Sequence, residues 1–200
     1  MACAVAAVST LRIVVVEGDE AFRQSMKEAL ESQGHSIVGE AGRGAEMVRL
    51  VLAEEPDVVV FDLHLPGFSG LEALRQIYQE YNLAAVALTE KRDHDLISKV
   101  LEDYQLTYLV KPVELHQLEP AVLVAWARFD RDRQLEEENA SLRQNLQNRK
   151  TIERAKGVLM RRYRWSEAEG YRRLQRGAMN NRTTMVQLAQ DVLNGIPVNL

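Results

Sequence analysis

The sequence predicts an α/β protein whose first part is a five-stranded parallel sheet and whose last part is entirely helical. Residues 11–110 alternate five times between a short apolar run and an amphipathic helical segment. Such alternation with short connections is typical of a parallel sheet covered by helices on both faces. From residue 113 onward the pattern is helical, which predicts a long helical arm followed by a small all-α domain.

The expected strands are short and apolar. In residues 58–61, four consecutive apolar residues, three of them β-branched, are too few for a helix and indicate a strand buried on both faces. The helices between the strands end at breakers such as Gly34 and Pro56. Right-handed crossovers then predict a flavodoxin-like strand order and a (βα)5 domain. The expected strands are residues 11–16, 36–38, 58–61, 83–88 and 106–110, and the helices include residues 45–55 and 96–104.

The helical part divides into an arm and three further helices. Pro120 is tolerated in the first turn of a helix that begins near Glu119. Ser166 and Glu169 form a capping box at the start of a later helix, and Gly195 ends the last one. We therefore expect a flexible leader at residues 1–10, the α/β domain at 11–118, a helical coiled-coil linker at 119–148 and a three-helix domain at 149–200.

Charge is distributed unevenly along the chain. Residues 149–200 hold 11 Lys and Arg against 4 Asp and Glu, so the tail is net positive while the remainder is strongly acidic. A basic end can neutralise phosphates, whereas an acidic front avoids polyanions. The single cysteine, Cys3, excludes an intramolecular disulfide and suits a reducing cytoplasm. Residues 1–8 are apolar but too short to span a bilayer, so we expect no membrane partner.

The arm carries a short leucine pattern at 4-3-4 spacing, formed by Leu135, Asn139, Leu142 and Leu146. This spacing predicts a coiled-coil seam between two chains, with Asn139 fixing the register. A single solvated helix with a few unconnected leucines is the alternative.

Reactive side chains collect where the expected strands end. In open parallel sheets, ligand chemistry takes place at the carboxyl ends of the strands. A carboxylate nucleophile that accepts a phosphoryl group needs acids that hold a divalent cation, a lysine that pairs with phosphoryl oxygens and a hydroxyl that senses them. All are present, as Glu17 and Asp19 after the first strand, Asp62 after the third, Thr89 after the fourth and Lys111 after the fifth. Each alone is consistent with a turn or a solvated surface, but their joint placement favours a site.

Residues 11 to about 118 resemble the receiver domain of response regulators. The motifs VVVEGDEAFR, VVFDLHLPGFSGLE, ALTE and YLVKP match the blocks of that family in order. The resemblance implies that Asp62 is the phosphoacceptor, Thr89 the switch hydroxyl, Tyr108 the switch aromatic and Lys111 the phosphate-pairing lysine. It also implies a sensor histidine kinase as partner and Mg²⁺ as cofactor.

One position departs from the receiver pattern. Receivers place two adjacent acids after the first strand, and here Glu17 is followed by Gly18. The implied metal ligands are therefore Glu17 and Asp62, with Asp19 as a substitute if the loop shifts. Because Mg²⁺ tolerates little departure from octahedral geometry, we expect weak Mg²⁺ binding. Gly18 also supports an alternative, a phosphorylation-independent pseudo-receiver regulated by a protein or a small ligand.

Residues 142 to about 194 resemble the ANTAR domain, the transcription antitermination module whose family binds RNA hairpins. The blocks IERAKGVLM, LQRGAM and QLAQDVL carry the resemblance, and the Ala-Lys-Gly triplet at 155–157 is its most specific element. A glycine inside a helix costs about 1 kcal/mol relative to alanine, so Gly157 is expected to serve packing or the approach of a ligand. The surrounding cluster of cations favours polyanion binding over a merely solvated face. The predicted RNA-binding residues are Arg149, Lys150, Arg154, Lys156, Arg161, Arg162 and Arg173.

The aromatic residues and the histidines say less about function than the motifs above. Tyr163, Trp165 and Tyr171 can stack on splayed RNA bases, although aromatic residues at helical spacing belong more often to a core. The four histidines show no metal-ligand spacing.

The two resemblances together imply a cytoplasmic two-component response regulator that acts as a transcription antiterminator and is not an enzyme. Phosphorylation or another signal at the receiver would control dimerisation and RNA-hairpin binding by the C-terminal domain. A DNA-binding helix-turn-helix output is the remaining alternative, and the block around residues 155–157 argues against it.

Overall fold

The computed structural model describes residues 10–90 and 106–199. The chain forms two compact units, Met1–Arg133 and Gln134–Leu200. The expected helix at 96–104, and the expected leader apart from residue 10, lie outside the described residues.

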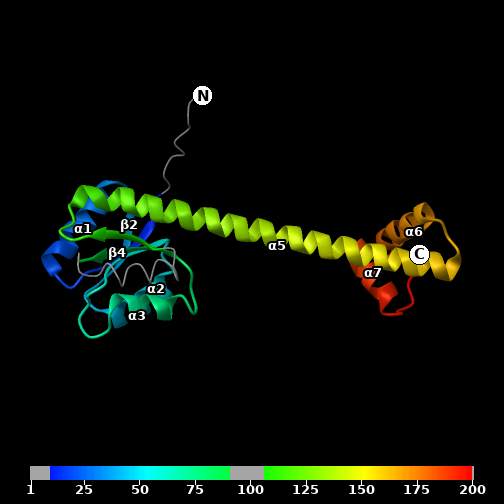
Figure 1. Cartoon of the computed structure of the whole chain (residues 1–200), viewed down its shortest axis with the longest axis horizontal. Coiled ribbons are helices and arrows are strands. Elements are labelled where there is room, and N and C mark those ends of the chain that lie inside the picture. The colour runs from blue at the N-terminus through cyan, green and yellow to red at the C-terminus, as the bar shows by residue number, and fades with distance from the viewer. Residues whose placement is uncertain (1–9, 91–105, 200) are drawn as a thin grey trace, which may run out of the picture. The chain divides into compact units, whose positions relative to one another are not determined.

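Five parallel strands form one sheet in the first unit, in the order β2-β1-β3-β4-β5 (Figure 1). This confirms the predicted flavodoxin-like sheet. Strand β2 runs three residues beyond its expected end, because pairing with β1 continues as far as Val16 and Ala41. The strands are β1 (Arg12–Val16), β2 (Ser36–Ala41), β3 (Val58–Asp62), β4 (Ala84–Thr89) and β5 (Thr107–Val110).

Helices α1 and α3 begin at residues whose side chains cap free backbone N–H groups, whereas Arg43 at the start of α2 does not. The Oδ1 of Asp19 accepts a hydrogen bond from the N–H of Phe22 at the start of α1. Ser69 and Glu72 form a capping box at the start of α3. The helices of the first unit are α1 (Glu20–Ser32), α2 (Gly44–Glu54), α3 (Gly70–Ile77), the short 3₁₀ helix η2 (Leu115–Gln117) and the beginning of α5 (Leu118–Tyr163).

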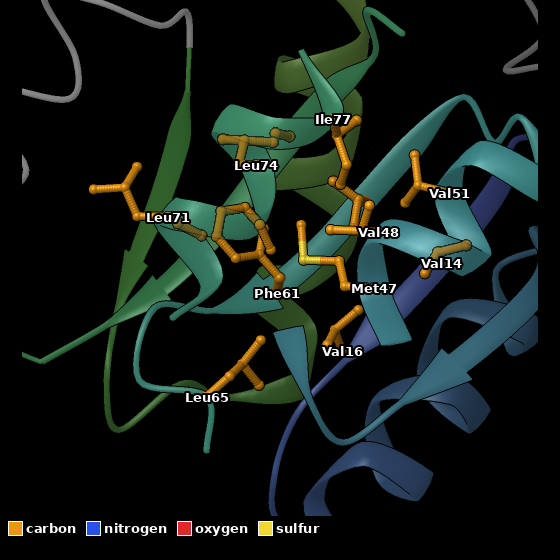
Figure 2. Packing of buried hydrophobic residues seen from close by; sticks show 14 of the residues in the cluster. Val14, Val16, Met47, Val48, Val51, Phe61, Leu65, Leu71, Leu74 and Ile77 are labelled. Atoms are coloured by element: carbon orange, nitrogen blue, oxygen red, sulfur yellow. The ribbon is translucent and has the colours of Figure 1, made fainter. Parts of the chain in front are cut away.

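The sheet separates two hydrophobic cores, because successive strand residues point to opposite faces. Strand β3 is buried at all five positions, as the sequence predicted. On one face, Phe61 packs among side chains of α2 and α3, including Met47 and Leu74 (Figure 2). On the other face, Val60 belongs to a core that also contains Leu30 of α1 and Val122 of α5. Both faces of β3 are therefore covered, and its carboxyl end is held rigidly.

Two glycines allow other elements to approach the loop that follows β3. A Cβ atom on Gly70 would overlap the carbonyl oxygen of Asp62 and the ring of Phe61. A Cβ atom on Gly44 would overlap the carbonyl oxygen of Phe68 in the same loop. The loop that carries Asp62 is thus packed against the first turns of both α2 and α3.

The second unit is a small bundle built from the end of α5 with α6 (Glu167–Asn180) and α7 (Met185–Leu193). The side-chain oxygens of Ser166 and Thr184 cap the two later helices. The bundle core consists of Ala155, Leu159, Leu174, Ala178, Leu188 and Ala189.

The expectation that the linker and the first bundle helix are separate elements is wrong. Helix α5 runs unbroken from Leu118 to Tyr163, so no break in the helix marks the expected boundary at residue 148. The helix continues because its sequence contains few helix breakers. Pro120 lies in the first turn, where proline is tolerated, and Gly157 is the one glycine within the helix. Among the described helices, none combines the length and the apolar composition that crossing a membrane requires.

We predict that Gly70→Ala destabilises the first unit by about 1–3 kcal/mol, because the new methyl group has to displace backbone rather than a flexible side chain. Urea denaturation followed by circular dichroism measures the loss. Gly18→Ala is the matched control, since its Cβ would meet only Pro66 Cδ at 3.6 Å, an ordinary contact. An unchanged unfolding midpoint for Gly70→Ala would contradict the packing described for this loop.

Candidate functional site

Glu17, Asp62 and Lys111 meet at the carboxyl edge of the sheet. Glu17 directly follows β1, Asp62 is the last residue of β3, and Lys111 directly follows β5. The Nζ of Lys111 donates hydrogen bonds to Asp62 Oδ2 at 2.6 Å and to Glu17 Oε2 at 2.8 Å. Both acids are buried, while 28% of the Lys111 side chain is exposed. The sequence predicted that residues at the carboxyl ends of the parallel strands would meet at one edge of the sheet, and these three residues do so.

The ammonium group of Lys111 balances the two buried carboxylates. Two carboxylates held close together and away from water repel each other unless a cation lies between them. Burial by itself lowers the pKa of Lys111, but hydrogen bonds to Asp62 and Glu17 outweigh that effect and hold its pKa above the ordinary value. Lys111 is consequently charged at neutral pH, and an incoming anionic group would meet a cation already in place.

Strand β4 positions Lys111 through its last residue. The N–H of Lys111 donates to the carbonyl oxygen of Thr89 at 2.7 Å, and the bond between Lys111 and Pro112 is cis. Thr89 is fully buried, and its hydroxyl donates to the carbonyl oxygen of Glu90 at 3.4 Å. The predicted switch hydroxyl therefore lies at the end of β4, one residue beyond the Leu88 that pairs with Asp62.

Three contacts of this site were not predicted from the sequence. The N–H of His64 donates to Asp62 Oδ1 at 2.9 Å. The Nη1 of Arg23 donates to the carbonyl oxygen of Glu17 at 2.6 Å. The ring of Phe22 lies 5.9 Å from the Nζ of Lys111. Phe22 and Arg23 are adjacent on α1, so one turn of that helix supports two of the site residues.

Two of the predicted site residues do not join the cluster. The carboxylate of Asp19 caps α1, and its own N–H donates to Glu17 Oε1 at 3.1 Å. Tyr108 lies on β5 at the edge of the sheet, with 38% of its surface exposed. Asp19 therefore performs a local structural task in this loop.

The residues present fit Mg²⁺ poorly. Glu17 and Asp62 supply two carboxylates, and the same Lys111 ammonium group engages both. Gly18 contributes no side-chain oxygen, and Asp19 is committed to its cap. Within residues 10–90 and 106–199, no group of three or more His, Cys, Asp or Glu could hold a metal ion. Receiver domains generally bind Mg²⁺ for phosphorylation.

A basic row occupies one exposed face of α5 in the second unit. Lys150, Arg154 and Arg161 are all exposed, and their spacing of four and seven residues places them on the same side of the helix. Among the described residues, none of the three forms an ion pair. Arg149 and Arg162, two further predicted RNA contacts, are also exposed. The row thus presents uncompensated positive charge.

Lys156 was expected at the surface with the other predicted RNA-binding residues, and that expectation is wrong, because the side chain is buried. Its side chain is only 8% exposed, and its Nζ forms ion pairs with Glu153 on the same helix and with Glu167 at the start of α6. Hydrogen bonds to Glu153 and then Glu167 hold the pKa of Lys156 above its ordinary value. Gly170 permits the close helix crossing, since a Cβ there would lie 3.3 Å from Lys156 Cγ. Lys156 therefore links α5 to α6.

The aromatic residues form a pair at the turn between α5 and α6. The rings of Tyr163 and Trp165 stack with their centroids 4.5 Å apart. Arg162 lies over Tyr163, and Arg173 lies over Trp165 while also pairing with Glu169. Trp165 packs partly against the bundle core, whereas Tyr163 is 46% exposed. Arg173 is thus engaged within the bundle, unlike the cations of the basic row.

The leucines of the expected seam are more than half exposed and, within residues 10–90 and 106–199, belong to none of the three hydrophobic cores. Leu135, Leu142 and Leu146 are 52%, 57% and 61% exposed, and Asn139 is also exposed. Three large apolar side chains at this spacing form an uncovered strip along one side of α5.

Comparison with known proteins agrees with the fold and with the two expected domains. Residues 13–123 match the profile of the response regulator receiver domain, and residues 140–193 match that of the ANTAR domain. A receiver structure from Clostridium thermocellum is 28% identical with a TM-score of 0.54, covering 58% of this chain and 94% of its own. A LuxR-family response regulator structure from Aurantimonas is 30% identical with a TM-score of 0.55, covering 60% of this chain and 86% of its own.

Similarity to one curated relative extends over nearly the full length. The transcriptional regulatory protein PdtaR of Mycobacterium tuberculosis is 36% identical over 182 residues, which cover 91% of this chain and 89% of that protein. LiaR of Bacillus subtilis is 32% identical over 117 residues, covering 58% of this chain and 56% of that protein. The chain belongs to the two-component response regulators, in the class that joins a receiver to an ANTAR domain and acts in transcription antitermination. Neither the pseudo-receiver nor the helix-turn-helix alternative is favoured by these matches.

We predict that Gly18→Asp tightens Mg²⁺ binding and speeds labelling of the receiver by a small-molecule phosphodonor, because it adds the third carboxylate. The backbone has room for the change, as the nearest atom to a Cβ on Gly18 is 3.6 Å away. Mg²⁺ titration and labelling with acetyl phosphate measure the two effects. Asp62→Asn should abolish labelling, and wild-type labelling as fast as that of Gly18→Asp would contradict the importance of the missing acid.

Proposed function

We propose that this chain is a cytoplasmic regulator whose receiver accepts a phosphoryl group from a sensor histidine kinase and controls RNA-hairpin binding by the ANTAR domain. The RNA-binding half of this proposal rests on the basic row Lys150, Arg154 and Arg161, three exposed cations that form no ion pair in the part of the chain that the structure describes. Apart from its own phosphoryl transfer, the chain is proposed to catalyse no reaction.

Asp62 is the proposed phosphoacceptor. One of its carboxylate oxygens would form the new bond to phosphorus as the bond between phosphorus and the kinase histidine nitrogen breaks. Lys111, already 2.6 Å from Asp62 Oδ2, is in place to pair with the phosphoryl oxygens. The N–H of His64 holds Asp62 Oδ1 and so orients the carboxylate. The cation of Lys111 lowers the repulsion between this buried carboxylate and the incoming phosphoryl group.

The change of charge at Asp62 offers a signal. After phosphorylation, the ammonium group of Lys111 would have to pair with the phosphoryl oxygens as well as with Glu17. Thr89, whose carbonyl oxygen holds the Lys111 N–H, and Tyr108 on the neighbouring strand are the proposed switch residues.

We further propose that the leucine strip of α5 pairs two chains. The three leucines are more than half exposed in the single chain, and their burial against a second copy would remove apolar surface from water. Asn139 at a central seam position would fix the register of the pair. A dimer would present two basic rows, so that paired hairpins on one transcript are bound with avidity.

We predict that Leu142→Asp abolishes dimerisation, because burying an unpaired carboxylate in a short apolar seam costs several kcal/mol. Light scattering at matched protein concentrations compares the variant with the wild type. Leu142→Ile is the control that keeps the seam apolar. If wild type and Leu142→Asp have the same mass, whether monomeric or dimeric, the leucine strip is not the interface.

The basic row is the proposed RNA contact. Each phosphate that a cation neutralises releases counterions, so affinity should fall with salt with a log-log slope of roughly −0.7 to −0.9 per contact. Hairpin loops should be preferred over duplex DNA, because RNA readers take unstacked loop bases as well as phosphates. Lys156 is not included among these contacts, since its charge is spent on Glu153 and Glu167.

We predict that Arg154→Ala together with Arg161→Ala flattens the salt slope by about two without unfolding the bundle, as both side chains are exposed. Fluorescence anisotropy with a two-hairpin RNA at several salt concentrations measures the slope. The control is Arg128→Ala with Arg131→Ala, the same loss of charge at exposed positions of the same helix within the first unit. Tighter binding to duplex DNA of equal length, or an affinity indifferent to salt, would rule out the proposed output.

A further inference from the structure

Gly157 lies inside a long helix without a packing reason. Glycine destabilises a helix interior relative to alanine, because it loses more conformational freedom on folding. Such a residue is retained either where another element comes too close for a side chain or where a ligand approaches the backbone. Gly170 on α6 is of the first kind, since a Cβ there would be crowded by Lys156 Cγ at 3.3 Å and Met160 Cγ at 3.5 Å.

The surroundings of Gly157 differ from those of Gly170. The nearest atom that a Cβ on Gly157 would meet is the Nη1 of Arg161, 4.0 Å away at the end of a flexible side chain. Its backbone lies in ordinary helix, and its φ is not in the left-handed region. Within the described residues, neither crowding nor backbone conformation requires a glycine at this position.

Gly157 lies within the basic row. Residues Lys150, Arg154, Gly157 and Arg161 follow one another at spacings of four, three and four, so they occupy one side of α5. Lys150 and Arg154 precede the glycine along the helix, and Arg161 follows it. The side of α5 that carries the unpaired charge therefore has a gap in its side-chain cover midway along the row.

We propose that Gly157 is an RNA-contact residue, at which the phosphodiester backbone of the bound hairpin lies directly against helix α5. This inference rests on the proposed RNA binding and adds where on the helix the strand runs. A polyanion complements the cations on both sides of the gap, and the absent side chain lets its phosphates approach all three together. Shorter approach strengthens each charge-assisted contact.

A second copy of this chain is a poorer occupant of the gap. Two α5 helices that met at Gly157 would bring one basic row against the other, and like charges repel. Glu153, the nearest acid along the helix, is already paired with Lys156. Charge complementarity thus favours RNA, and dimerisation is measured as a separate outcome.

The test asks whether one substitution in the full chain raises the stability of the bundle while it lowers the affinity for RNA. Gly157→Ala should raise the melting temperature of the bundle by several degrees, because alanine is the better helix former and has room for its methyl group. The same variant should bind a synthetic two-hairpin RNA about tenfold more weakly, roughly the loss of one charge-assisted hydrogen bond. Gly157→Leu should bind more weakly still. A Trp126→Phe background leaves Trp165 as the bundle's own fluorescence reporter of unfolding.

Two controls separate the possible causes. Asn145→Ala replaces an exposed residue of α5 outside the row with a better helix former, and it should raise stability without changing RNA affinity. Gly170→Ala should gain less stability than Gly157→Ala, because its methyl group would lie 3.3 Å from Lys156 Cγ and has to displace that side chain. A Gly157→Ala protein that is less stable, or that dimerises more weakly at unchanged affinity per site, would overturn the proposal.

The remaining outcomes are also distinct. If Gly157→Ala is stabilised but binds the RNA as tightly as the wild type, the contact at Gly157 is refuted while RNA binding by the domain stands. If the wild-type chain shows no preference for the two-hairpin RNA over duplex DNA, the proposed function fails and this inference fails with it.

Discussion

A single ammonium group, that of Lys111, holds the carboxyl edge of the receiver sheet together. It bridges the carboxylates of Asp62 and Glu17, which follow different strands and would repel each other without it. Its own backbone N–H is anchored on the carbonyl oxygen of Thr89 at the end of β4. The last residues of β3 and β4 and the residues that follow β1 and β5 are thus joined through Lys111. Asp62 and Glu17 share its ammonium group, so a change of charge at Asp62 would alter the ion pair with Glu17.

In the second unit, some cations are paired within the bundle and others are left unpaired at its surface. Lys156 is buried and paired with Glu153 of α5 and Glu167 of α6, so it links the two helices. Arg173 is paired with Glu169 within α6 and lies over Trp165. The carboxylates of Glu153, Glu167 and Glu169 are engaged in those ion pairs. The cations on the far side of α5 are left without partners, which is unfavourable for an isolated surface and favourable for one that meets a polyanion.

Much of the fold and the receiver site could be predicted from the sequence. The continuous apolar runs of the buried strands, the N-cap at Ser166 and the stops at Gly34 and Pro56 are local signals that tertiary packing did not override. Asp62 and Lys111 lie 49 residues apart, yet the rule that parallel strands end at one edge was enough to place them together. The support given by Phe22 and Arg23 was missed, because nothing in their spacing shows which strand end they face.

What the sequence determined by itself was the order of the elements, the strand ends that carry the reactive groups and the net charge of the tail. The tertiary structure decided which charges remain available. The sequence placed Lys156 among the RNA-binding cations, but Gly170 lets α6 approach α5 closely, and Lys156 is buried and paired with Glu167. It also decided that Gly157 has no packing role. Hydrophobic periodicity depends on residues within a few turns, whereas ion pairing and crowding depend on helices brought together from distant parts of the chain.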